Sequence, residues 1–179
     1  MQEEAFPQLV ETYYAALYRF ALSLAKNPSD AGDLTQQTFF VWATKGASIR
    51  DGSKAKSWLF TTLYREFLRG RRRSGRMVAI EDLAPSEQEI PEVETDLVSK
   101  MDAPLVLEAL QEVDSTFREP LTLFYLQDLS YLEIAEILSI PIGTVMSRLS
   151  RGKAQLRSLL AQKAQGGRVI EFPKQGARS

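Results

Sequence analysis

The side chains best suited to recognise another molecule are gathered between Ser130 and Lys153. The second half of this stretch carries hydroxyl and guanidinium groups, which hydrogen-bond to the base edges and phosphates of nucleic acids. Catalysis is disfavoured, because the 179 residues include no His and no Cys and contain no glycine motif that cradles phosphate. We therefore expect a recognition protein rather than an enzyme, with no catalytic residue, no metal site and no cofactor.

The apolar residues around these groups predict two short helices joined by a turn. The first helix is expected over 131–138, and the second opens at Thr144 and packs through Val145. The small Ala135 allows the two helix backbones to approach closely. This spacing is typical of a helix-turn-helix, whose second helix enters the DNA major groove. An ordinary pair of antiparallel helices is the alternative.

The second of these helices is expected to be polar and basic on its far face. Arginine is the commonest protein contact to guanine, which makes Arg148 the first candidate for a base contact. The remaining candidates are Thr144, Ser147 and Arg151 for base contacts, and Lys153 and Arg157 for phosphate contacts.

The rest of the chain predicts an all-α fold, because apolar residues recur with helical spacing and no strand pattern occurs. Further helices are expected at about 3–26, 30–45, 54–73, 105–113 and 118–126. Ser29 or Asp30 is expected to cap the second of these, and Pro120 is expected in the first turn of the last. Ser130 and Glu133 have the spacing of a capping box. Residues 45–53 are expected to form an exposed, mobile loop.

Charge is strongly segregated along the chain. Residues 1–76 hold 12 Lys or Arg against 7 Asp or Glu, whereas residues 77–104 hold 1 against 8. The four arginines of 71–76 are explained either by phosphate contacts or by a solvated helix end. The proline-containing acidic stretch has the composition of a flexible linker. The predicted organisation is a helical unit at 1–76, a linker at 77–103, a second helical unit at 104–165 and a tail at 166–179.

The chain has no feature of a membrane protein at sequence level. No apolar run approaches the roughly 20 residues of a membrane span, and the acidic, amphipathic N-terminus is unlike a signal peptide. We expect a soluble, cytoplasmic protein without membrane insertion.

Three stretches together resemble the extracytoplasmic-function (ECF) sigma factors of bacterial RNA polymerase, in the minimal form with only the second and fourth sigma domains. The stretches are 30–39 (DAGDLTQQTF), 57–60 (SWLF), and 129–138 with 143–153 (LSYLEIAEIL and GTVMSRLSRGK). The resemblance covers about residues 5–162. It implies a promoter-specificity subunit made of two small helical domains joined by an acidic linker, which threads the RNA path of the polymerase.

The resemblance also implies partners and sites. The partners are core RNA polymerase, through its clamp helices and flap, and promoter DNA in double- and single-stranded form; many relatives also bind an anti-sigma factor. The implied contacts to core polymerase are Asp30, Asp33, Gln36, Gln37 and Phe39. Recognition and melting of the −10 element are implied for Lys54, Lys56, Trp58, Thr61, Tyr64, Arg65, Arg69 and Arg72, with the loop 45–53 capturing a flipped base. The helix-turn-helix would contact the −35 element.

Some positions depart from the common pattern of this family. The family commonly has Arg-Asn where Tyr64-Arg65 stand, Lys at Met146 and glycine at Ser139. It usually has Glu at the positions of Gly32 and Gln37. Trp58 fits a base-stacking role, but its place on the apolar side of a helix equally fits a core residue.

One alternative function remains open at this point, which is a dimeric LuxR-type regulator with an N-terminal helical sensor domain. The basic helix and arginine cluster of residues 54–76 favour the sigma factor, because a sensor domain does not need them.

Overall fold

The computed structural model describes residues 5–49, 51–75 and 103–165, and these are α-helical apart from two short 3₁₀ turns and the connections. The predicted all-α fold is therefore confirmed. The N-terminal unit comprises α1 (Ala5–Ala25), α2 (Pro28–Lys45) and α3 (Ala55–Arg73), with 3₁₀ turns at Gly46–Ser48 and Gly52–Lys54. The C-terminal unit comprises α5 (Ala103–Glu112), α6 (Ser115–Gln127), α7 (Tyr131–Leu138) and α8 (Ile142–Gln165). The predicted linker, apart from Ala103, and the predicted tail lie outside the described residues.

Aromatic and aliphatic side chains hold the N-terminal unit together. Phe20 of α1 packs against Phe60 of α3, with ring centroids 5.6 Å apart. Trp42 of α2 meets Trp58 of α3 edge to face, with centroids 5.1 Å apart. Such contacts between aromatic rings add to the apolar burial of the helices. Trp58 is partly buried in this packing, which favours the core role considered for it.

The structure confirms one of the three predictions made for helix ends and differs from the other two. The capping box is confirmed, because the Ser130 hydroxyl accepts from the Glu133 amide and the Glu133 carboxylate accepts from the Ser130 amide. The cap of α2 is Asn27 rather than Ser29 or Asp30, since Pro28 suits the first helical position. Helix α6 begins at residue 115, so Pro120 lies inside it and not in its first turn.

The turn between α7 and α8 has the predicted helix-turn-helix form. Ser139 ends α7 with a positive φ of 55°, and its amide donates to the carbonyl groups of Ala135 and Glu136. Glycine adopts this left-handed conformation more easily, so Ser139 carries some backbone strain. Ala135 and Val145 are both buried where the two helices meet, as predicted.

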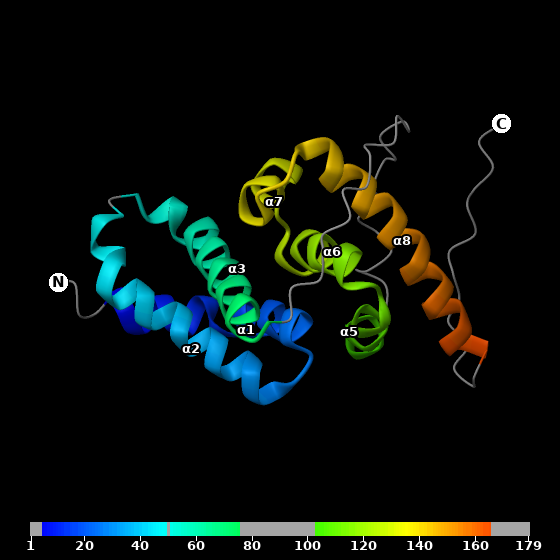
Figure 1. The fold of residues 1–179 in the computed structure, drawn as a ribbon, viewed down its shortest axis with the longest axis horizontal. Helices are drawn as coiled ribbons and strands as arrows, with labels where there is room; N and C mark the ends of the chain where they lie inside the picture. Colours follow the sequence, from blue (N-terminus) through cyan, green and yellow to red (C-terminus); the bar gives the residue numbers. More distant parts are fainter. Residues whose placement is uncertain (1–4, 50, 76–102, 166–179) are drawn as a thin grey trace.

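The two units pack on each other within the part of the chain that the structure describes. Helix α1 contacts α6, and α3 contacts α7, so the buried apolar side chains form a continuous core through both units (Figure 1). None of the described helices is both long enough and apolar enough to span a membrane.

Alanine substitutions at two helical glycines test how closely α8 packs against α6. A Cβ on Gly152 would lie 2.9 Å from Phe117 Cβ and 2.8 Å from Leu121 Cδ1, whereas a Cβ on Gly70 would meet nothing within 4 Å. Overpacking costs about 1–3 kcal/mol, which exceeds the gain in helix propensity of about 1 kcal/mol. We expect Gly152→Ala to lower the free energy of unfolding measured in urea, and the matched Gly70→Ala to raise it. Equal effects of the two substitutions would contradict this packing.

Candidate nucleic-acid interface

The outward face of α8 carries exposed cations and partly exposed polar side chains. Arg151 and Arg157 are exposed, and Thr144, Met146 and Lys153 are partly exposed. The helix therefore presents guanidinium, ammonium and hydroxyl groups to solvent along its length, and these are the groups that contact base edges and phosphates.

Arg148, the first candidate for a base contact, does not lie on this exposed face in the structure. It is only 6% exposed, because it lies three residues after Val145 and four before Gly152, on the side of α8 that packs against α6. Ser147 is buried as well. Within the described residues, Arg148 Nε and Ser147 Oγ have no hydrogen-bond partner. A contact of either residue with DNA stays a prediction.

A buried carboxyl group lies close enough to Arg148 to be influenced by its charge. Glu119 of α6 is 8% exposed, and its Oε2 accepts a hydrogen bond of 3.0 Å from the Tyr64 hydroxyl of α3. Burial raises the pKa of Glu119; the Tyr64 hydrogen bond and then the guanidinium groups of Arg118, Arg148 and Arg71 lower it by less. Burial and the neighbouring carboxyl raise the pKa of Tyr64 as well.

Arg118 has a different, structural role. Its side chain is buried, and Nη1 donates to the carbonyl oxygens of Gln111 and Val113 at 3.1 and 3.0 Å. These carbonyls belong to the C-terminal end of α5, where helices leave acceptors unpaired. Arg118 thus ties α5 to α6 and supports the helix that packs behind α8.

The structure divides the side chains assigned to the −10 element into two groups. Four cations of the set are exposed to solvent: Lys54, Arg65, Arg69 and Arg72. Trp58 and Thr61 are partly exposed, and the Thr61 hydroxyl donates to the Ser57 carbonyl at 2.7 Å.

Lys56 and Tyr64 form the second group, and both are occupied by the C-terminal unit. Lys56 Nζ donates to the Gln127 carbonyl at 2.6 Å, and Tyr64 is 7% exposed and bonded to Glu119. Neither side chain is free to contact another molecule in this arrangement, and their assignment to the −10 element stays a prediction.

The side chains assigned to polymerase binding share one face of α2, with one exception. Asp30, Asp33, Gln36 and Gln37 are exposed. Phe39 is buried, because its ring packs against Phe6 and Tyr14. The exposed aromatic residue is its neighbour Phe40, which is 64% exposed and lies four residues after Gln36 on the same face. Helical spacing from Gln36 was the signal that could have found it.

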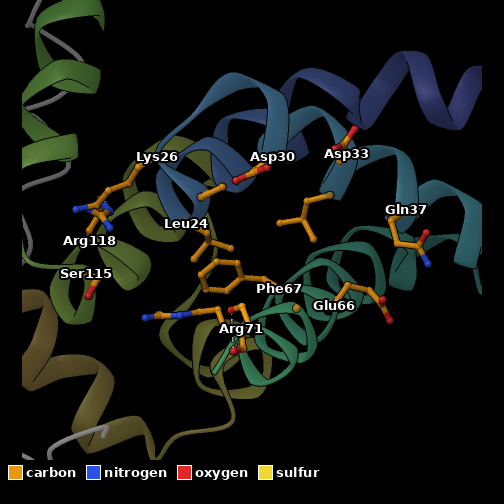
Figure 2. A pocket seen from close by; sticks show the side chains of 14 residues that line it. Leu24, Lys26, Asp30, Asp33, Gln37, Glu66, Phe67, Arg71, Ser115 and Arg118 are labelled. Atoms are coloured by element: carbon orange, nitrogen blue, oxygen red, sulfur yellow. Dashed lines mark hydrogen bonds between the residues drawn. The ribbon is translucent and has the colours of Figure 1, made fainter. Parts of the chain in front are cut away.

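A cavity of about 820 Å³ opens beside this face, between α2, α3 and the start of α6. Asp30, Asp33 and Gln37 line one side of it, and Figure 2 shows Phe67 and Arg71 of α3 across from them. Arg71 lies over the Phe67 ring, 5.4 Å from its centroid. The described residues contain no cluster of acidic side chains able to hold a metal ion.

Comparison with known proteins agrees with this architecture. Residues 9–77 match the family model for sigma-70 region 2, and residues 105–156 match the model for sigma-70 region 4. The chain is 35% identical to the ECF RNA polymerase sigma factor SigE of Mycolicibacterium smegmatis over 88% of its length, but spans only 62% of that protein. It is 32% identical to the ECF sigma factor SigM of Bacillus subtilis, covering 85% of this chain and 93% of that one.

Two solved structures of sigma factors are similar to this chain. The sigma factor RpoE of Bartonella quintana, in complex with the anti-sigma factor NepR, has a TM-score of 0.66 and 29% identity, covering 88% of this chain and 98% of that one. CnrH, in complex with the cytosolic domain of CnrY, has a TM-score of 0.59 and 23% identity, covering 89% and 90%, and supports the fold alone.

The chain thus belongs to the ECF sigma factors of RNA polymerase, which are non-catalytic factors of transcription initiation. The family matches favour this identity over the LuxR-type regulator considered as the alternative.

The buried Glu119 predicts a pH dependence of stability. A raised pKa in the folded state contributes stability that is present below the ordinary carboxyl value of 4.5 and is lost as pH rises through the raised pKa. Relative to Glu119→Gln, the wild-type free energy of unfolding should fall as pH rises from about 4.5 through the raised pKa of Glu119.

Urea titrations across this range measure the difference between the two proteins. The matched control is Glu136→Gln, at an exposed position of α7. A wild-type advantage over Glu119→Gln that stayed constant or grew with pH would contradict the assignment.

Proposed function

We propose that this chain directs core RNA polymerase to promoters, with α8 contacting the −35 element and α3 with residues 45–54 opening and contacting the −10 element. The observation that carries the proposal is the helix-turn-helix, whose α8 presents Arg151 outward, in a chain with a second basic helix in a sigma-70 region 2. The polymerase makes the bonds, so the chain itself acts as a specificity factor and not as an enzyme, in the cytoplasm.

Because Arg148 is buried, we assign the main base contact to another residue. Arg151 is exposed three residues further along α8, and it is the side chain we assign to a base edge, together with Thr144. Arg148 is buried on the side of α8 that packs against α6 and helps to hold the two helices together, while Lys153 and Arg157 contact phosphates. On α3 the exposed Lys54, Arg65, Arg69 and Arg72 would bind the DNA backbone and the separated strand.

The contact with core polymerase is assigned to the exposed face of α2. Asp30, Asp33, Gln36 and Gln37 lie there with Phe40, which takes the place of the buried Phe39. Exposed aromatic residues beside polar groups are typical of protein interfaces. In the C-terminal unit, Leu132 and Ile142 are exposed apolar side chains suited to a contact with the flap.

An anti-sigma factor is a further partner that we propose. Support comes from the solved structure of RpoE, a relative bound to the anti-sigma factor NepR.

Run-off transcription tests the proposed function directly. Promoters are first identified by mapping transcription start sites after overexpression, and then transcribed with purified core polymerase. The expected result is a promoter-dependent product only when both this chain and the core enzyme are present. No product from any mapped promoter would overturn the proposal.

Arg151→Ala tests the −35 contact. Loss of a bidentate contact to guanine costs about 1–3 kcal/mol of discrimination, so promoter use should fall while thermal stability is unchanged. Arg148→Ala should lower thermal stability, because it removes a buried side chain between α8 and α6 whose charge offsets that of the buried Glu119. Arg19→Ala, at an exposed position of α1, serves as the control. Full activity of the Arg151→Ala protein on every −35 sequence would contradict the assignment.

Asp33→Arg tests the polymerase contact. Reversing one charge on the exposed face of α2 should weaken binding to core polymerase at least about tenfold, which corresponds to about 1.4 kcal/mol. Binding is measured by titrating labelled protein with core enzyme. Glu11→Arg makes the same change on the exposed surface of α1 and should leave affinity unaltered. Equal affinities of the two variants for core polymerase would exclude this face of α2 as the polymerase-binding surface.

A further inference from the structure

The cavity between α2, α3 and the start of α6 carries opposite charges at its two ends. Three cations and a hydroxyl group line the end nearest α6, and carboxylates line the far end, with the Phe67 ring between them (Figure 2). Its volume of about 820 Å³ lies in the range of small-molecule sites. The cationic end is formed by Lys26, Arg71, Arg118 and Ser115, and the acidic end by Asp33 and Glu66.

Lys26 reaches the cationic end from an uncommon backbone conformation. It lies in the short connection between α1 and α2, where its φ is 62°. Glycine adopts this left-handed conformation more easily, so the backbone does not explain a lysine at this position. The side chain lines the cavity, and within the described part of the chain it forms no hydrogen bond or ion pair. Its ammonium group is therefore available to an anionic ligand.

The N-terminal end of α6 adds to the positive charge at this end. Ser115 is the first residue of α6, and the N-cap residue Asp114 makes no side-chain capping hydrogen bond. The Asp114 carboxylate instead accepts from Gln155 Nε2 of α8 at 2.9 Å. Helix N-termini with free amide groups favour phosphate and other anions. Arg118, whose Nε is buried and has no partner among the described residues, contributes charge through the wall of the cavity.

Asp33 is the carboxylate available at the acidic end. Glu66 is paired with Arg69 at 3.2 Å, and Asp30 accepts a hydrogen bond of 2.6 Å from Asn27 Nδ2. Asp33 is exposed and has no such partner within the residues that the structure describes. A fitting ligand therefore carries an anionic group at one end and hydrogen-bond donors at the other.

We propose that this cavity binds a guanine nucleotide, with its phosphates at Lys26, Arg71 and Ser115 and its base at Asp33. Guanine presents two adjacent donors, N1–H and the exocyclic amino group, and a carboxylate accepts both. Adenine presents one donor and one acceptor on the corresponding edge, so a carboxylate suits it less well. Glu66 and Ser74, which both line the cavity, are eight residues apart, or roughly 12 Å along a helix, which an extended mononucleotide can span.

A bound nucleotide would cover part of the polymerase-binding face of α2, because Asp30, Asp33 and Gln37 line the same cavity. Nucleotide and core polymerase would therefore compete for this chain. The competition rests on the proposed function, which assigns these residues to the polymerase contact, whereas nucleotide binding itself does not.

Calorimetric titration of the full-length protein tests the site with guanosine diphosphate (GDP), adenosine diphosphate (ADP) and inorganic pyrophosphate. GDP should bind at one site, and the other two compounds should bind at least about tenfold more weakly. Equal affinities for GDP and ADP would overturn the assignment of guanine. Absence of GDP binding at millimolar concentration would overturn the site.

Lys26→Gly tests the cationic end without straining the backbone. GDP affinity should fall at least about tenfold, while thermal stability should not fall, because glycine suits the positive φ. Arg19→Ala removes an exposed cation of α1 that lies outside the cavity, and GDP affinity should be unaltered. Unchanged affinity in Lys26→Gly, or equal losses in both proteins, would refute the phosphate position.

Asp33→Asn tests the acidic end. An amide offers one acceptor in place of a carboxylate that accepts two donors, so the preference for GDP over ADP should be lost while pyrophosphate affinity is retained. A preference that survived this change would contradict the position of the base.

Competition is measured by titrating labelled protein with core polymerase. Saturating GDP should weaken binding of the wild type and should affect Lys26→Gly much less; equal effects on both would refute the competition. GDP binding without transcription on any mapped promoter would support the site but contradict the proposed function. Transcription without GDP binding would do the reverse, so the two failures are distinguished.

Discussion

The structure depends on how the carboxyl group of Glu119 is accommodated. An acidic group removed from water is unfavourable unless other groups hydrogen-bond to it or offset its charge. Tyr64 from α3 and the guanidinium groups of Arg118, Arg148 and Arg71 do this for Glu119. These residues come from both units. The one carboxyl group therefore influences how α8 packs on α6, and also how α6 packs against the N-terminal helices.

This arrangement explains which side chains of α8 are buried and which are exposed. Gly152 allows a close approach to α6, and Val145, Arg148 and Leu149 on the same side are buried. Arg151 and Arg157 remain exposed on the other side. Each unit is small, and a unit of this size buries only ~60% of its unfolded surface, so packing against the other unit stabilises both. The same packing engages Lys56 and Tyr64 in hydrogen bonds to the C-terminal unit.

The helices and the helix-turn-helix could be predicted because their apolar residues recur every three or four positions and because Ser130 and Glu133 have capping-box spacing. Residue type favours Arg148 as a base contact, whereas its register with the buried Val145 predicts a buried side chain, and register likewise distinguishes the buried Phe39 from the exposed Phe40. The burial of Arg148 and Phe39 could be predicted from helical geometry. The pairing of Tyr64 with Glu119 could not, because the two residues are 55 positions apart and nothing local links them.

Hydroxyl-radical footprinting on a mapped promoter tests the central claim, that one chain joins two DNA-contacting units in the service of RNA polymerase. The account predicts that core polymerase with this chain protects both the −35 and the −10 regions, while the chain alone protects neither. Protection of a two-fold symmetric site by the chain alone would contradict it and would instead indicate a dimeric regulator of transcription.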